Sequence, residues 1–357
     1  MGSGEWAVTT TFESVLTWNY DVAHQGLRDL YEKAKREQWN VSVDVDWSPP
    51  VDPEAEILLD HENPHVALIQ DSAIWRKMTP PERAALRYET LAWNLSQFLH
   101  GEQLAIFVAG QLAAAVPWID AKLYGSTQVV DEARHAEVFS RYLRDKIGKE
   151  YPLADSTHSI FNTILTESRW DFKYLGLQVV LEGLAMGLFS RMYGAAKEPI
   201  LRRVLKLVMQ DESRHFAFGN LSLRRFYDNM PEHERHERED FAYEVCACMR
   251  GRVFPVAAWE TIGLPVDACM TATRQGARQS GAQKSAFNRV VPALKAVGLL
   301  SDRIRPHYAN MGLLKYEDAP IEPDLDCSSG ESCRQEAMLS STSSPVHVHA
   351  PKRVICD

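Results

Sequence analysis

The feature that most constrains this sequence is an internal repeat. The five-residue motif Asp-Glu-x-Arg-His occupies residues 131–135 and returns 80 residues later at 211–215. Each copy also has a glutamate 30 residues before its own second residue, so a set of one glutamate, one Glu-x-x-His pair and their spacing is reproduced in full. The six residues that share this register are Glu102, Glu132, His135, Glu182, Glu212 and His215. Chance does not readily produce such a match.

The spacing within each motif suits a metal ligand pair on a helix. Glu132 and His135 are three residues apart, which places a carboxylate and an imidazole on one helical face, one turn apart, where both can reach a single ion. Glu212 and His215 repeat this arrangement. Four carboxylates can balance two divalent cations, and mixed oxygen and nitrogen donors suit iron or manganese better than the thiolate-rich sets of many structural zinc sites. The motif therefore predicts a two-metal centre.

The neighbours of the four glutamates support burial of this centre. Residues one turn away from them are largely apolar, as with Phe98 and Ile106 around Glu102. A buried carboxylate without a partner is costly, so four of them at matched positions require cations. Two alternatives are buried ion pairs with Arg134 and Arg214, and an old duplication that no longer holds metal. The common register of all six residues favours the metal centre over both.

Most of the chain between residues 81 and 300 is predicted to be helical. Apolar residues at three- and four-residue spacing predict long helices over about 81–116, up to 148, 159–196 and 199–229, a fifth after Pro231, and a further helical segment at 270–300. Four long helices with short connections form a bundle. We divide the chain into an N-terminal lead-in packed on the bundle (1–80), a helical metal-binding domain with a C-terminal helical extension (81–318), and a disordered polar tail (319–357).

Composition narrows the class of partner and the location. The net charge of −9 and a pI near 5.8 leave no basic surplus for binding nucleic acid, so a small-molecule substrate fits better. The N-terminus has no basic lead followed by an apolar stretch, and we find no run of roughly 18 apolar residues to span a bilayer. We therefore expect a cytoplasmic protein that does not enter the membrane.

In its two motifs, the sequence resembles the ferritin-like diiron-carboxylate oxygenases, and in particular the p-aminobenzoate N-oxygenase group. The resemblance rests on two copies of Glu, 28 intervening residues and Asp-Glu-x-Arg-His, and covers about residues 85–230. It implies an all-α fold with a ferritin-like four-helix bundle core and additional helices at both ends. It also implies that the six residues named above bind two iron ions, with a manganese–iron pair as the alternative, and that O₂ is the co-substrate.

The resemblance implies supporting roles for the other motif residues. Asp131 and Asp211 would accept hydrogen bonds from the ligand histidines, while Arg134 and Arg214 would keep those aspartates charged. The alternative for all four is ordinary salt bridging on the helix surface, and the repetition of both residue types in both copies favours the supporting role. Apolar residues beside the ligands are candidates for a substrate pocket, although such residues are often plain core: Phe139, Met186, Val208 and Phe216.

Four positions depart from particular relatives. N-oxygenases of the p-aminobenzoate type carry an additional histidine ligand one turn before the last motif glutamate, where this chain has Val208. Ribonucleotide reductase small subunits with a tyrosyl radical place a tyrosine where this chain has Phe139. The valine and tyrosine that become crosslinked in the related ligand-binding oxidases are here Leu104 and Leu177. The last two comparisons argue against a tyrosyl radical at that place and against such a crosslink.

The function we expect is that of a non-haem diiron oxygenase. Two ferrous ions would activate O₂ to oxidise a small organic substrate, by N-oxygenation of an amine first and by C-hydroxylation or desaturation as alternatives. Electrons would come from an external donor, because the chain has no flavin or nicotinamide fingerprint and no cluster-binding cysteine set. A homodimer is a possible assembly. A ferritin-like storage or peroxide-scavenging protein needs the same ligands but a shorter chain, and the intact ligand set opposes a metal-free interaction protein.

Overall fold

From residue 73 onward, most helices follow one another with short connections. The computed structural model describes residues 6–321, apart from residues 53, 54, 56, 62, 64, 253 and 280–285. The first half of this described part contains α1 (Gln25–Arg36), α2 (Ala73–Lys77), α3 (Pro80–Ala115), α4 (Ile119–Tyr142), the π-helix η1 (Leu143–Ile147) and α5 (Asp155–Thr166). The second half contains α6 (Trp170–Lys173), the π-helix η2 (Tyr174–Leu181), α7 (Glu182–Ala195), α8 (Pro199–Leu223), α9 (Glu232–Arg252), α10 (Val256–Thr261), α11 (Val266–Gln279), α13 (Val290–Ala296), α14 (Arg305–Asn310) and the 3₁₀ turn η3 (Leu314–Tyr316).

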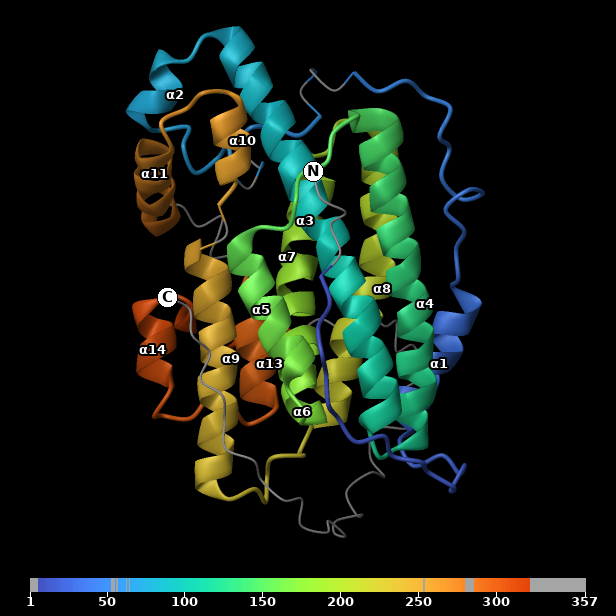
Figure 1. Ribbon diagram of the computed structural model, residues 1–357. Coiled ribbons are helices and arrows are strands. Elements are labelled where there is room, and N and C mark those ends of the chain that lie inside the picture. The colour runs from blue at the N-terminus through green and yellow to red at the C-terminus, as the bar shows by residue number, and fades with distance from the viewer. Residues whose placement is uncertain are drawn as a thin grey trace.

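Four long elements form the central bundle: α3, α4, the continuous run α6–η2–α7, and α8 (Figure 1). The expected all-α helical-bundle fold is confirmed. Local sequence sets the helix ends. Thr79 and Glu82 form a reciprocal cap at the start of α3, and Val116 followed by Pro117 ends that helix. The carboxylate of Glu198 accepts hydrogen bonds from two backbone N–H groups at the start of α8.

The prediction of one uninterrupted helix over 159–196 is wrong. The chain breaks between α5 and α6, where the Glu167 carboxylate accepts bonds from the backbone N–H and the guanidinium of Arg169. The buried Lys173 ammonium donates to two carbonyls at the end of α5, those of Ile164 and Leu165. Side chains thus satisfy the backbone groups that a continuous helix would pair, which no apolar periodicity reveals.

Helices α4 and α8 run in opposite directions. The Tyr142 hydroxyl at the end of α4 donates to Glu198 before the start of α8, at 2.9 Å. At the other end, the Tyr124 ring in α4 packs on Phe218 in α8, with ring centroids 4.5 Å apart. Residue numbers therefore rise along one helix while they fall along the other. This antiparallel pairing decides which motif residues meet.

The remaining elements surround the bundle. Helix α1 packs on α4 and α8, α10 packs on α3, and α9 and α13 pack on η2 (Figure 1). The helical segment expected at 270–300 consists of the end of α11 and of α13, with residues 280–285 outside the described part. Almost all of the expected polar tail (319–357) also lies outside the described residues, which end at Ile321. The division into three parts remains a prediction.

The central run Trp170–Ala195 is long and apolar enough to cross a membrane by length and composition, contrary to our expectation. In the fold, 78% of its most apolar window is buried inside the protein. Its apolar character therefore belongs to a core helix that is covered on most sides by its neighbours. It is the one such segment among the described residues.

Candidate metal centre

The bundle brings all six repeat residues together in its interior. Glu102 comes from α3, Glu182 from the start of α7, and the two Glu-x-x-His pairs from α4 and α8. They form two overlapping groups in which the nitrogen and oxygen atoms lie within 4.8 Å of one another. The first group holds Glu102, Glu132, His135 and Glu212, and the second holds Glu132, Glu182, Glu212 and His215. Two neighbouring positions, which share two carboxylates, are thus offered to metal ions.

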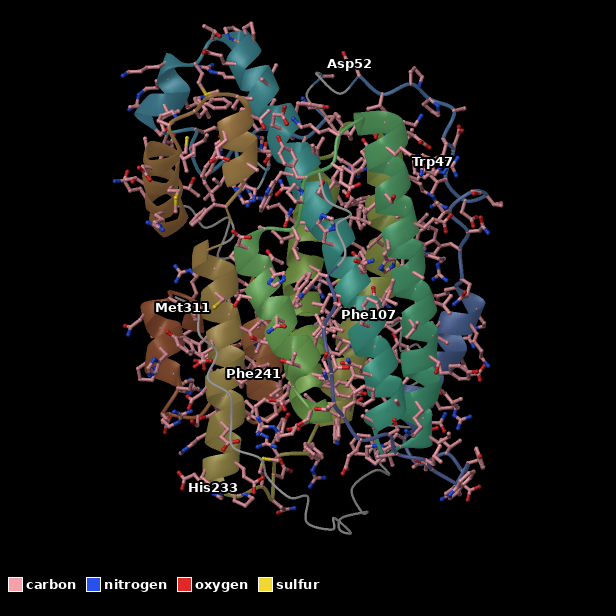
Figure 2. The ribbon with its side chains drawn as sticks, viewed as in Figure 1. Trp47, Asp52, Phe107, His233, Phe241 and Met311 are labelled. Carbon is pink, nitrogen blue, oxygen red and sulfur yellow. The ribbon has the colours of Figure 1, made fainter. Side chains whose placement is uncertain are left out.

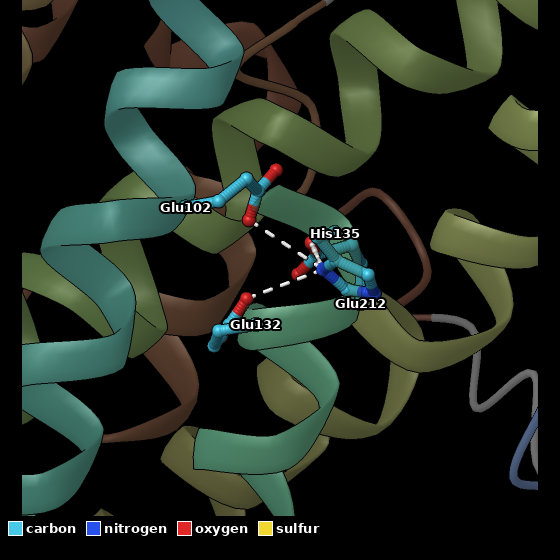
Figure 3. A group of neighbouring side chains, drawn as sticks. All are labelled: Glu102, Glu132, His135 and Glu212. Atoms are coloured by element: carbon cyan, nitrogen blue, oxygen red, sulfur yellow. Dashed lines mark ion pairs between the residues drawn. The ribbon is translucent and has the colours of Figure 1, made fainter. Parts of the chain in front are cut away.

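The first position is centred on the Nδ1 atom of His135 (Figure 3). This nitrogen lies 3.2 Å from Glu132 Oε2 and 3.1 Å from Glu212 Oε1, and Glu102 Oε2 lies 3.5 Å away. Figure 3 shows these four side chains, which come from three helices, converging on one point. All four are buried.

The second position mirrors the first. His215 Nδ1 lies 3.2 Å from Glu132 Oε1 and 3.0 Å from Glu212 Oε2. Each shared carboxylate therefore directs one oxygen to each imidazole, which is the geometry of a bridge between two ions. Glu182 completes this second group, as Glu102 completes the first.

The outer nitrogens of the histidines pair crosswise with the motif aspartates. His135 Nε2 lies 3.1 Å from Asp211 Oδ2, and His215 Nε2 lies 3.3 Å from Asp131 Oδ2. Each histidine thus contacts the aspartate of the other repeat. The antiparallel course of α4 and α8 explains this, since the later residue of one motif faces the earlier residue of the other. An Asp–His contact of this kind fixes the ring orientation and leaves Nδ1 facing the carboxylates.

The two arginines hold the aspartates from the outside. Arg134 bonds to Asp131 at 2.5 Å and to Asp211 at 3.1 Å, and Arg214 bonds to Asp211 and lies 3.6 Å from Asp131. Both aspartates are fully buried, and so is Arg214. Buried charges of opposite sign thus compensate one another next to the centre. A surface role for these residues is excluded by their burial.

Three residues that the sequence interpretation missed complete this network, and all follow α1. The Trp39 indole N–H donates to Asp211 Oδ2 at 2.7 Å. Gln38 accepts from Arg134 at 2.8 Å, and Glu37 accepts from Arg214 at 2.9 Å. They lie almost 100 residues before the first motif, and no spacing in the sequence links them to it.

The donor set passes a direct test of whether it fits metal ions. Glu132 Oε2 and His135 Nδ1 are buried, lie 3.2 Å apart, and have no hydrogen-bond partner among the described residues. Buried polar atoms of this kind are rare and need a partner. Two cations would supply the missing partners, because four carboxylates and two imidazoles at these distances form a suitable set of oxygen and nitrogen ligands.

The pKa values of four of the six residues point the same way. Burial raises the pKa of Glu102 and of Glu182 well above the usual value. Burial alone would lower the pKa of His215, but the charges of Glu132 and Glu212 raise it to about 10. His135 behaves similarly, because Asp211 and the carboxylates outweigh burial and raise its pKa. Without cations, protons therefore balance the negative charge, and metal binding must displace them.

Two further residues, both glutamines, lie beside the second position: one contacts its carboxylates, and the other contacts the first glutamine. The Gln128 amide donates to Glu132 Oε1 at 2.8 Å and lies 3.3 Å from Glu182 Oε1. The Gln178 amide donates to the Gln128 carbonyl oxygen at 2.8 Å. Each glutamine precedes a repeat glutamate by four residues, and this spacing is a signal that the sequence contains and that our interpretation did not use.

The four pocket candidates, including Met186, are all buried, but they do not belong to one apolar cluster. Phe139 and Val208 belong to one apolar cluster, where Phe139 packs with Phe98 and Phe189 at ring-centroid distances of 6.0 and 5.9 Å. Phe216 belongs to a different cluster and packs near Gly183. Their role as substrate contacts stays a prediction.

A profile of the family described as p-aminobenzoate N-oxygenase AurF matches residues 21–298, well over half of the chain. No curated protein sequence gives a significant match.

Among solved structures, an R2-like ligand-binding oxidase with an aerobically reconstituted Mn/Fe cofactor has 19% identity and a TM-score of 0.44, covering 72% of this chain and 92% of its own. A variant of such an oxidase with an anaerobically reconstituted Mn/Fe cofactor has 19% identity and a TM-score of 0.46, covering 76% and 95%. These similarities do not bear on which metals this chain binds. The family match does decide its class: the chain belongs to the p-aminobenzoate N-oxygenase family and is a non-haem diiron oxygenase that acts on a small-molecule substrate.

Proposed function

We propose that this protein transfers one oxygen atom of O₂ to the nitrogen of a small aromatic amine. The observation that carries the proposal is the combination of a complete, buried two-position donor set with membership of a family described as a p-aminobenzoate N-oxygenase. Conversion of an amine to a hydroxylamine in this way consumes O₂, two electrons and two protons and releases water. An external donor supplies the electrons.

The six repeat residues are proposed to hold two irons, with a manganese–iron pair as the alternative. Glu132 and Glu212 would bridge, because each directs one oxygen to either imidazole. Glu102 and His135 would complete the first position, and Glu182 and His215 the second. When bound, the two irons supply the redox chemistry with which O₂ is activated.

The surrounding residues orient these ligands and control their protons. Asp131 and Asp211 accept from the outer nitrogens of the histidines, so the inner nitrogens are free to bind metal. Arg134 and Arg214 place a positive charge against both aspartates and hold them between α4 and α8. This support also excludes water from one side of the centre, because the aspartates are fully buried.

The substrate is proposed to bind on the side of Phe139 and Val208. Phe98 lies one turn before Glu102 and Phe139 one turn after His135, so both rings belong next to the first position. Phe98 also packs on Phe189 at 4.8 Å, edge to face. An arene can replace one such contact without exposing apolar surface to water. Val208, in place of the family's additional histidine, leaves this side free of a further polar ligand.

The test is aerobic turnover of the iron-loaded protein with a chemical reductant and ring-deuterated aromatic amines under ¹⁸O₂. N-oxygenation adds one ¹⁸O atom and retains every ring deuterium, whereas ring hydroxylation removes one deuterium. Glu212→Ala provides the matched inactive control. A product that gains oxygen with loss of ring deuterium would replace N-oxygenation by C-hydroxylation. Iron accumulation without any oxidised product would instead favour storage.

We further propose that two copies of the chain associate through the outer face of α3 and α4. Between residues 101 and 136 the exposed positions carry no charge: Gln103, Phe107, Gly110, Pro117, Ser126, Val130 and Ala133. Phe107, which is labelled in Figure 2, is 58% exposed, and Val130 is 48% exposed. Such an uncharged face suits a permanent interface between identical copies better than a transient electron donor. Light scattering should give twice the chain mass, and Phe107→Glu should reduce it to one chain.

A further inference from the structure

The residues one turn before the four repeat glutamates differ in a way that the repeat does not explain. Phe98 and Val208 precede Glu102 and Glu212, whereas Gln128 and Gln178 precede Glu132 and Glu182. Both glutamines are fully buried, with 0% of their surface exposed. The two copies of the repeat thus supply the same ligands, but the residues one helical turn before those ligands differ.

The two amides form a chain that ends on the second metal position. One Gln128 N–H group donates to Glu132 at 2.8 Å, and the same nitrogen lies 3.3 Å from Glu182. These carboxylates come from α4 and α7, so a single amide links two helices at the centre. Gln178 then donates to the Gln128 carbonyl oxygen at 2.8 Å.

The direction of the Gln128 amide is fixed by its surroundings. Its nitrogen faces two carboxylate oxygens, which can only accept, and its oxygen receives the N–H of Gln178. The Gln178 carbonyl oxygen has no hydrogen-bond partner among the described residues. Because an unpaired buried carbonyl destabilises a fold, a glutamine at this place calls for a reason other than stability.

The backbone is also arranged around Gln178. This residue lies in the π-helix η2 immediately before Glu182, and π-helical segments inside α-helices are frequent at functional sites. Helix α8 passes so close that a Cβ atom on Gly219 would lie 2.5 Å from the Gln178 Cβ atom. Glycine at 219 is therefore required for α8 to approach η2 this closely at residue 178.

The first position has no counterpart to this amide chain. Within the described part of the chain, the polar partner of Glu102 is His135, and the residue one turn earlier is Phe98. From this contrast we propose that Gln128, oriented by Gln178, is a positioning residue that makes the second metal position bind its ion more tightly than the first. The proposal rests on the ligand roles given under the proposed function.

The experiment is a titration of the metal-free full-length protein with Mn²⁺, in which free Mn²⁺ is measured by electron paramagnetic resonance. Wild type should bind two ions per chain in two distinguishable steps. Gln128→Met keeps the side-chain length and removes the hydrogen bonds, and should weaken the tighter step by about 10- to 100-fold while the other step stays unchanged. Gln178→Met should weaken the same step by a smaller factor.

Two single-position backgrounds assign the effect. In Glu102→Gln, where binding is confined to the second position, the loss caused by Gln128→Met should persist. In Glu182→Gln, where binding is confined to the first position, it should vanish. Gln111→Met is the matched control, because Gln111 is a buried amide of the same bundle that contacts Lys173 rather than the centre. It should leave both binding steps unchanged.

The outcomes separate this inference from the function. If wild type binds two ions but Gln128→Met binds them as wild type does, or weakens both steps equally, the positioning role is refuted and the proposed function stands. If wild type binds no Mn²⁺ and no Fe²⁺, the ligand assignment itself fails. A loss of affinity in Gln111→Met equal to that in Gln128→Met would also refute the inference, because general loosening of the bundle would then explain it.

Discussion

The crossed contacts between aspartates and histidines can be tested by double-mutant cycles. Asp131 contacts His215 of the other repeat at 3.3 Å, although His135 of its own repeat is only one turn away along α4. We therefore pair Asp131→Asn with His215→Ala in one cycle and with His135→Ala in a second. Asp131→Asn also disturbs Arg134, but this effect occurs in both arms of each cycle and cancels.

The expected coupling follows from the geometry. A buried hydrogen bond between charged partners contributes about 1.5–3 kcal/mol. The raised pKa of His215, about 10, indicates that its imidazole is charged near neutral pH in the metal-free chain. The crossed cycle should therefore give about 1.5–3 kcal/mol, and the same-repeat cycle less than about half of that. The cycle of Asp211→Asn with His135→Ala should resemble the crossed one, since that contact is 3.1 Å.

The assay is urea unfolding of metal-free protein near pH 7 in the presence of a chelator, followed by circular dichroism. Equal coupling in the crossed and same-repeat cycles would mean that the aspartates act only through a diffuse field. A larger coupling within one repeat would contradict the antiparallel register of α4 and α8.

Two other predictions concern stability. Phe139→Ala should lower the free energy of unfolding by about 3–5 kcal/mol, because the fully buried ring packs on Phe98 and Phe189. Urea unfolding measures this change. A loss below about 1 kcal/mol would show that the ring is not part of a packed core. In the metal-free chain, stabilisation by the His215 imidazolium should be complete below pH 6.5 and be lost as the pH rises towards 10. The raised pKa of Glu102 and of Glu182 also makes the folded chain less stable as the pH rises above 4.5. Chelator-treated protein should thus be less stable at pH 9 than at pH 6. Bound metal should remove or reverse this difference. Greater stability of the metal-free protein at pH 9 would contradict the titration argument.

The all-α bundle and the convergence of the six repeat residues were accessible from the sequence. Apolar periodicity predicts helices, and the common register predicts convergence because both copies must use the same geometry. The break at Glu167–Arg169 was not accessible, because side chains there replace backbone hydrogen bonds without altering the apolar pattern. Single-sequence periodicity also could not distinguish the π-helical turns of η2 from α-helix.

The supporting residues show a similar limit. Asp131 and Asp211 were visible in the motif, but their crossed partners follow from the antiparallel pairing of α4 and α8, which requires the topology. Gln128 and Gln178 carried a readable signal in their four-residue spacing to the glutamates. Trp39 carried none, because a long-range hydrogen bond from a segment outside the repeat leaves no trace in one sequence.

The most direct test of the central claim is the metal content and oxygen reactivity of the purified protein. We predict two irons per chain by elemental analysis and an optical change when the anaerobic ferrous protein meets O₂, with loss of both in His215→Ala. A wild-type chain that is folded by circular dichroism, takes up no iron and shows no optical change would contradict the account.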